Sequence, residues 1–203
     1  MTGPDGRLDA GGDGGAVGSG GADAAPVPAV EPKPVASTEP KPGPRFTHLD
    51  SAGAARMVDV ADKPVSARTA VATGRVLVSE QVLALLRGAG MPKGDALAVA
   101  RIAGIQGAKR TADLIPLCHP IGLAGVSVDL DLGEGAVLIR ARVRTADRTG
   151  VEMEALTAVA VAGLTLVDMV KAVDPAAVIT DVQVESKSGG MSGAWAREES
   201  GSH

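Results

Sequence analysis

Alternation of apolar and polar residues predicts most of the strands in this chain. The stretches GVSVDLDL (125–132) and AVLIRARVRT (136–145) both alternate with a period of two residues, and a short glycine-rich turn, 133–135, joins them. Two alternating segments with such a connection are typical of a β-hairpin. The segments 68–78 and VITDVQVES (178–186) predict two further strands.

Helical periodicity predicts three helices. The stretch SEQVLALLRGAG (79–90) opens with Ser79, a candidate N-cap, and stops at glycines. After Asp95, residues at helical spacing form a face on which another backbone can come close: Leu97, Ala100, Ala103, Gly104 and Gly107. The third helix, 152–173, is long and apolar, and Pro175 lies just beyond its end.

These elements follow one another in the order β, α, α, β, β, α, β. Antiparallel strands with helices returning on one side form a two-layer α+β sandwich. The sequence therefore predicts an α+β fold of the ferredoxin-like βαββαβ kind, with an antiparallel sheet and one additional helix.

The two ends of the chain differ in composition from its middle. Residues 1–44 contain ten glycines and eight prolines and few large aliphatic side chains. Such a segment buries too little apolar surface to offset its ordering entropy. We expect a disordered tail over 1–44, one folded domain over 45–196, and a short disordered C-terminal tail over 197–203.

Composition narrows the class of protein further. Aromatic residues make up only 1% of the chain, so the core is aliphatic, and subunit association is a plausible additional source of buried surface. The formal net charge of −4 does not favour binding to nucleic acid. A single cysteine allows no intrachain disulfide, and neither a signal peptide nor a membrane span is apparent. We expect a cytoplasmic protein without a membrane partner.

Two lysines near glycines are candidates for anion binding. Lys93 stands before Gly94 and Asp95 at the head of a predicted helix, where backbone N–H groups and the helix dipole favour an anion. An ordinary helix cap with a solvated lysine would give the same pattern. Lys187, in the turn KSGG after the last strand, could reach a phosphate or belong to a plain loop.

The stretch DLIPLCHP (113–120) holds the only cysteine and one of three histidines. Neighbours in an extended segment point to opposite sides, so we expect one of Cys118 and His119 to face inward and the other outward, without a thiolate–imidazole pair. A buried cysteine and a structural histidine are the plain alternatives. No second cysteine or histidine stands at ligand spacing, so no metal site is expected.

Two groups of charges belong to the long predicted helix. Glu152 and Glu154 begin it, where acids complement the helix dipole, but residues two apart diverge by roughly 200° around a helix. They can act on one ligand only if the segment is still entering the helix there. Asp168 and Lys171 lie three apart in an apolar run, within salt-bridge reach. They are either a structural ion pair or an acid and a base held in a cleft.

Several long segments in a fixed order resemble one known family. The segments THLDSAGAARMVDV, KGDALAVARIAGIQGAKRTADLIPLCHP, TGVEMEAL, DMVKAV and KSGGMSG are similar to those of the cyclic pyranopterin monophosphate synthases, the C proteins of molybdenum cofactor biosynthesis. The resemblance runs from about Thr47 to Trp195. It covers nearly all of the predicted folded part.

The resemblance implies a fold, an assembly and a reaction. It implies ferredoxin-like α+β chains in homohexamers, trimers of dimers, with active sites at subunit interfaces. The implied reaction converts 3′,8-cyclo-7,8-dihydroguanosine 5′-triphosphate into cyclic pyranopterin monophosphate and diphosphate. No cofactor is obligatory, although Mg²⁺ can accompany the triphosphate.

The resemblance also assigns roles to residues. It implies catalytic roles for Asp168, Lys171 and Lys93. The implied substrate-binding residues are Leu117, Cys118, His119, Glu152, Met153, Glu154, Lys187 and, on a less matched segment, Arg68. Met191 departs from the pattern, because some family members have a further lysine there. We keep two alternatives open, a catalytically silent oligomeric binder of nucleoside phosphates and a metal-dependent phosphohydrolase.

Overall fold

The computed structural model describes residues 48–50, 52–88 and 95–198 of the chain. The chain divides into two units between Gly43 and Pro44, and every described residue belongs to the second. The predicted tail over 1–44, the residue Lys93 and the end of the predicted C-terminal tail, 199–203, lie outside the described residues. The boundaries of the predicted domain remain predictions.

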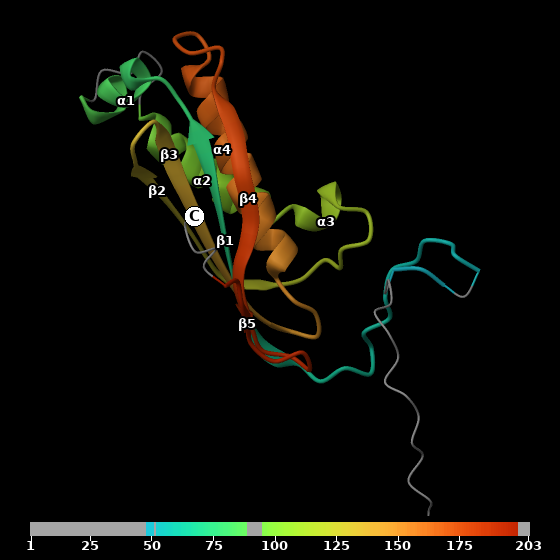
Figure 1. Ribbon diagram of the computed structural model, residues 1–203. Helices are drawn as coiled ribbons and strands as arrows, with labels where there is room; N and C mark the ends of the chain where they lie inside the picture. The colour runs from blue at the N-terminus through green and yellow to red at the C-terminus, as the bar shows by residue number, and fades with distance from the viewer. Residues whose placement is uncertain (1–47, 51, 89–94, 199–203) are drawn as a thin grey trace, which may run out of the picture. The chain divides into compact units, whose positions relative to one another are not determined.

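The described part is built around one antiparallel sheet of five strands in the order β2-β3-β1-β4-β5 (Figure 1). The strands are β1 (Ser66–Leu77), β2 (Leu123–Leu132), β3 (Ala136–Asp147), β4 (Val178–Ser188) and β5 (Trp195–Ala196). The four predicted strands and the β2–β3 hairpin are confirmed. The sequence did not predict β5, a two-residue strand that pairs with the end of β4 through Lys187 and Ser186.

Four helices accompany the sheet: α1 (Glu80–Arg87), α2 (Ala96–Ala108), α3 (Thr111–Leu114) and α4 (Glu152–Val170). Ser79 caps α1 as predicted, because its hydroxyl accepts a hydrogen bond from the Val82 N–H. Asp95 caps α2 in the same way. The short α3 lies where an extended segment was expected, and α4 ends at Val170, three residues earlier than predicted. The fold is α+β, as predicted.

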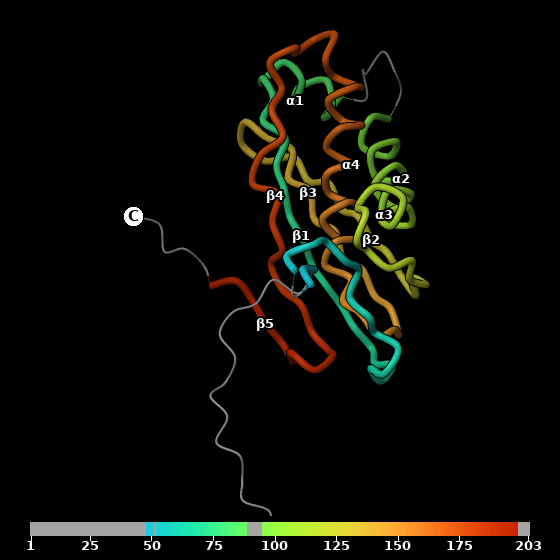
Figure 2. Tube along the Cα trace, turned by 90° about the vertical axis from the view of Figure 1, so that its right-hand side faces the viewer, coloured from blue at the N-terminus to red at the C-terminus, as the bar shows by residue number. Residues whose placement is uncertain are grey.

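The helices α2, α3 and α4 lie on one side of the strands, as Figure 2 shows. The strand β3 illustrates the resulting asymmetry. Its residues Ile139, Ala141 and Val143 are buried, whereas the alternating arginines 140, 142 and 144 are exposed. The sheet therefore has one covered face and one open face, which is called the open face below.

The two long helices pack closely because their contact is made by small residues. A Cβ atom on Gly104 would lie 2.8 Å from the Ala158 carbonyl oxygen, and one on Gly107 would lie 2.8 Å from Val161. The predicted small-residue face of α2 is therefore a helix–helix contact. By length and composition α4 could cross a membrane, but 50% of its apolar window is buried in the protein, as expected of a core helix.

Candidate active site

The first turn of α4 and the segment before β2 enclose one cavity of about 340 Å³, called the acid–base cavity. Residues 58–63, which precede β1, complete its wall through Val58, Val60 and Lys63. Six residues that the sequence singled out border this one cavity: Leu117, Cys118, His119, Glu152, Met153 and Glu154. Segments more than thirty residues apart in the chain thus meet at one place.

Glu154 is the most deeply buried charged side chain of this group, with 4% of its surface exposed. Burial, with a smaller contribution from the nearby Glu152 carboxylate, raises the pKa of Glu154 to about 7, although a hydrogen bond from its own backbone N–H lowers it. A carboxyl group with such a pKa can hold or release a proton near neutral pH. Both glutamates border the cavity because α4 only begins at Glu152.

The imidazole of His119 is oriented by the backbone. Its Nε2 atom lies 2.8 Å from the Val58 carbonyl oxygen. A carbonyl oxygen only accepts hydrogen bonds, so Nε2 carries the hydrogen, and Nδ1 is the nitrogen available for proton exchange. The same contact attaches the segment before β1 to the cavity wall.

Cys118 borders the same cavity as His119. Both residues are half-buried. The direction in which each side chain points stays a prediction. Burial raises the pKa of the Cys118 thiol, and Glu154 raises it further. A raised pKa keeps the sulfur protonated, which suits a wall residue better than a nucleophile.

A second cavity of about 240 Å³ adjoins the first and is called the cation-lined cavity. Four cationic side chains line it: Lys63, Arg68, Arg148 and Lys187. The two cavities share Lys63, Thr149, Gly150 and Glu152. A space that can exchange protons thus opens into one that attracts negative charge.

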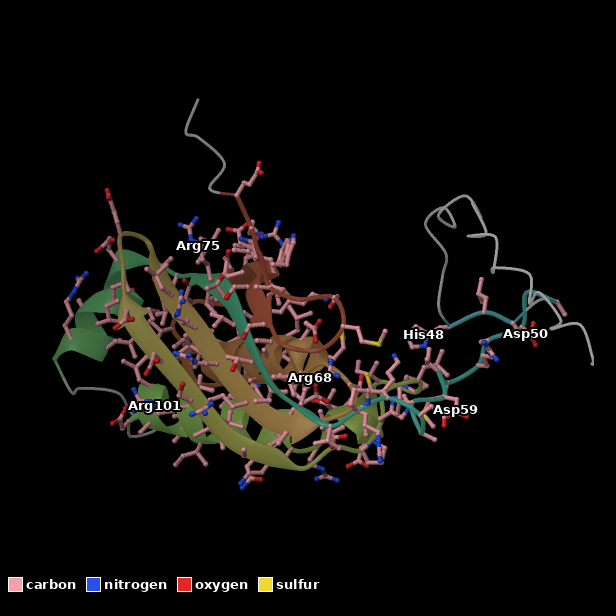
Figure 3. The ribbon with its side chains drawn as sticks, turned by 90° about the horizontal axis from the view of Figure 1, so that it is seen from below. His48, Asp50, Asp59, Arg68, Arg75 and Arg101 are labelled. Carbon is pink, nitrogen blue, oxygen red and sulfur yellow. The ribbon has the colours of Figure 1, made fainter. Side chains whose placement is uncertain are left out.

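Arg68 holds the rim of the cation-lined cavity together. Its Nε and Nη2 atoms donate to the carbonyl oxygens of Asp147 and Arg148, each at 2.9 Å. Arg68 lies at the end of β1 from which the segment carrying Asp59 extends (Figure 3). The turn after β4 covers its guanidinium so closely that a Cβ atom on Gly190 would collide with Nη1.

Arg148 extends this arrangement to the segment before β1. Its Nε atom donates to the Lys63 carbonyl oxygen at 3.0 Å. The sequence analysis missed both Lys63 and Arg148, because they lie in loops without periodicity. The available signal was their position near two segments of the family resemblance: Lys63 lies three residues after MVDV, and Arg148 lies directly before TGVEMEAL. Met191, the departure from the family pattern, also lines the cation-lined cavity.

Asp168 and Lys171 lie elsewhere. Their carboxylate and ammonium are 2.7 Å apart and both side chains are 60% exposed, so they form an exposed ion pair. The alternative role, as an acid and a base held in a cleft, stays a prediction. Asp168 lies sixteen residues beyond Glu152 on the same helix, which corresponds to about 24 Å along its axis. Neither residue borders the two cavities described above. Lys93 lies outside the described residues.

The chain is similar to known proteins over most of its length. The model of the MoaC family matches residues 57–190. Cyclic pyranopterin monophosphate synthase of Streptomyces coelicolor is 71% identical over 153 residues, covering 75% of this chain and 90% of that protein. The protein of the same name from a Nocardioides species is 68% identical over 156 residues, covering 75% of this chain and 96% of that protein.

A third relative is cyclic pyranopterin monophosphate synthase 2 of Mycobacterium tuberculosis. It is 59% identical over 151 residues, covering 74% of this chain and 90% of that protein. The residues matched by the family model include most of the lining of both cavities and the whole of α4. The chain belongs to the MoaC family.

Proposed function

We propose that this protein is a cyclic pyranopterin monophosphate synthase, a lyase of molybdenum cofactor biosynthesis. It converts 3′,8-cyclo-7,8-dihydroguanosine 5′-triphosphate into cyclic pyranopterin monophosphate and diphosphate. The names of its relatives support this activity. The single observation that carries it in the structure is the junction of the acid–base cavity with the cation-lined cavity. A purine-derived ring needs proton transfers, and a triphosphate needs cations.

We assign the residues of the two cavities to these two roles, proton transfer and phosphate binding. Glu152, Glu154 and His119 orient the ring system and pass protons. Lys187, together with Lys63, attracts the triphosphate and stabilises the charge on the departing diphosphate. Arg68 supports this group by fixing the loop at 147–148.

The remaining catalytic roles stay proposals. Asp168 and Lys171 exchange protons during opening of the imidazole ring and formation of the pterin. Lys93 adds a further charge near the phosphates. Leu117, Cys118 and Met153 form the apolar wall against the ring system.

Turnover of the purified protein tests this function. The protein is incubated with the cyclic dihydroguanosine triphosphate, and the pyranopterin product is detected by mass spectrometry while diphosphate is measured separately. Substrate binding without diphosphate release would instead support the catalytically silent binder. Among the described residues no group of three or more potential metal ligands occurs. Loss of turnover on adding a chelator would support the phosphohydrolase alternative. Adding Mg²⁺ back would then show whether the bound triphosphate requires this ion.

We further propose that the protein is a homohexamer, a trimer of dimers, in which one protomer supplies Asp168 and Lys171 to the cavities of another. The separation of about 24 Å along α4 supports this assembly. The outward side of the helical layer is also apolar, with Val99, Ile102 and Leu164 exposed by 42%, 62% and 61%. A helix that is apolar all round is normally covered. The cytoplasmic location stays a prediction.

Mixing two inactive variants tests this assembly. His119→Ala and Asp168→Ala are co-expressed with different affinity tags, and oligomers carrying both tags are isolated. If each site draws on two protomers, random association restores about a quarter of the wild-type sites. If each site belongs to one chain, the mixed oligomers stay inactive. Light scattering after size-exclusion chromatography measures the number of protomers.

A further inference from the structure

A groove of about 470 Å³ lies on the open face of the sheet, bordered by β1, β3, β4 and β5. We call it the open-face groove. Three of its lining residues, Thr69, Lys187 and Ser188, also line the cation-lined cavity. The groove is therefore a continuation of that cavity onto the open face.

Two arginines of β3, Arg140 and Arg142, border the groove. In the register of the sheet, Arg142 stands between Val71 of β1 and Ser127 of β2, neither of which is charged. Within the described residues no ion pair of Arg142 is found. Its guanidinium therefore keeps its donors for a ligand or for water.

Arg140 has acidic neighbours, but they do not close the groove. It stands opposite Asp129 of β2 and near Glu185 of β4. Glu185 is already engaged, because its carboxylate accepts hydrogen bonds from Thr73 and Gln183. These bonds, with the attraction of Arg197 and Arg140, lower the pKa of Glu185.

The rest of the lining suits phosphate oxygens. The hydroxyl groups of Thr69, Ser186 and Ser188 add neutral donors to the positive charges of Arg140 and Arg142. The ammonium of Lys187 pairs with Glu152 instead. Guanidinium groups bind phosphate through two parallel hydrogen bonds, and hydroxyl groups add single ones. The combination matches a small, multiply charged anion better than an apolar ligand.

We propose that the open-face groove binds a diphosphate group beside the cation-lined cavity. The group is either the diphosphate product or the terminal phosphates of the bound triphosphate. The proposal rests on the proposed function, in which a triphosphate loses diphosphate.

Trp195 provides a direct test, because it borders the groove and is the only tryptophan of the chain. Inorganic diphosphate is titrated into the full-length protein while Trp195 fluorescence is recorded. Calorimetry on the same solutions measures the affinity independently of the indole. We expect saturable binding that Arg142→Gln weakens about tenfold, the value of one charge-assisted contact. Arg144→Gln is the matched control, since it removes the same charge from the same exposed side of β3 outside the groove.

Each outcome decides between alternatives. The proposal that the open-face groove binds diphosphate would be overturned if calorimetry detects no binding. It would also be overturned if Arg142→Gln and Arg144→Gln weaken diphosphate binding equally. Steady-state kinetics distinguish the two sources. If only the product binds there, Arg142→Gln raises the inhibition constant of diphosphate and leaves KM unchanged, whereas terminal phosphates in the groove make KM rise as well. Diphosphate binding without any turnover would refute the proposed function but would still support diphosphate binding in the open-face groove.

Discussion

The ammonium of Lys187 lies 2.9 Å from the Oε1 atom of Glu152, so the end of β4 is attached to the first turn of α4. The two side chains are only 34% and 28% exposed. Both residues line the cation-lined cavity. An anion that enters the cavity competes with Glu152 for the ammonium. The ion pair therefore positions the ammonium at the cavity, and a bound anion can replace Glu152 as its partner.

Removal of this lysine is therefore expected to weaken substrate binding more than folding. Lys187→Ala should raise KM about tenfold, because one charge-assisted contact to phosphate is lost. Thermal unfolding should change little, since a partly exposed ion pair contributes about 1 kcal/mol or less. Steady-state kinetics and calorimetry measure the two effects. Arg87→Ala, which breaks an exposed pair with Glu80 on α1, is the control that leaves KM unchanged. An unaltered KM in Lys187→Ala would contradict the assignment.

Glu154 makes the stability of the fold depend on pH. Its pKa is about 7 in the folded protein and near its ordinary value of 4.5 in the unfolded chain. Between these values the folded state binds more protons than the unfolded state, so stability falls as pH rises through this window. Wild type should lose about 3 kcal/mol more than Glu154→Gln between pH 4.5 and 7.

Urea unfolding at constant protein concentration checks this difference. Glu134→Gln, in the exposed turn of the β2–β3 hairpin, is the control and should follow wild type. Parallel stability curves for wild type and Glu154→Gln would show that Glu154 titrates normally.

The turn after β4 allows a test of how Arg68 acts. Gly190 and Gly193 both have positive φ angles, of 73° and 69°. Alanine costs about 1 kcal/mol at either position for that reason. Only at Gly190 would the new Cβ atom push the Arg68 guanidinium away from the Asp147 carbonyl.

Gly190→Ala should therefore lower kcat/KM at least about tenfold more than Gly193→Ala, which corresponds to one charge-assisted hydrogen bond. Thermal unfolding should shift in both variants, and further in Gly190→Ala, which also loses the Arg68 contact. Equal activity in the two would mean that Arg68 does not position the rim of the cavity. Arg68→Lys, which keeps the charge but loses the paired donors, should resemble Gly190→Ala.

The contact between α2 and α4 predicts a purely structural effect. Gly104→Ala places a methyl group 2.8 Å from the Ala158 carbonyl oxygen and 3.1 Å from the Ala162 side chain. Overpacking of this kind costs about 1–3 kcal/mol, more than the helix propensity that alanine adds. Chemical unfolding should show the loss. Gly125→Ala on β2, where a Cβ atom meets nothing within 4 Å, should be close to neutral.

Hydrophobic periodicity predicted the elements that are long enough for the pattern of apolar positions to repeat within them. Strands of ten or more residues and the helices α1, α2 and α4 all carried their pattern in the sequence. The helix α3 has four residues and β5 has two, so neither completes a recognisable period. The end of α4 was placed too late because residues 171–173 remain compatible with a helix by composition. The turn there is set by Lys171, which caps the helix.

The candidate site was predictable only in part. Sequence segments identified six residues of the acid–base cavity. Lys63 and Arg148 reach the site through backbone contacts across 85 residues, which no local pattern reveals. The sequence left the role of Asp168 open, because an apolar run usually signals burial, whereas here the outward side of α4 is apolar as well.

The helix α4 sets the distance between the acidic residues at its two ends. Glu152 and Glu154 stand at one end of it and Asp168 at the other. Insertion of a single residue near Ala160 would advance the far end by about 1.5 Å and rotate it by about 100°. In an assembly that joins protomers through both ends, such a change would misalign every site at once. Length variation in this protein should therefore accumulate in its loops and termini and spare the middle of α4.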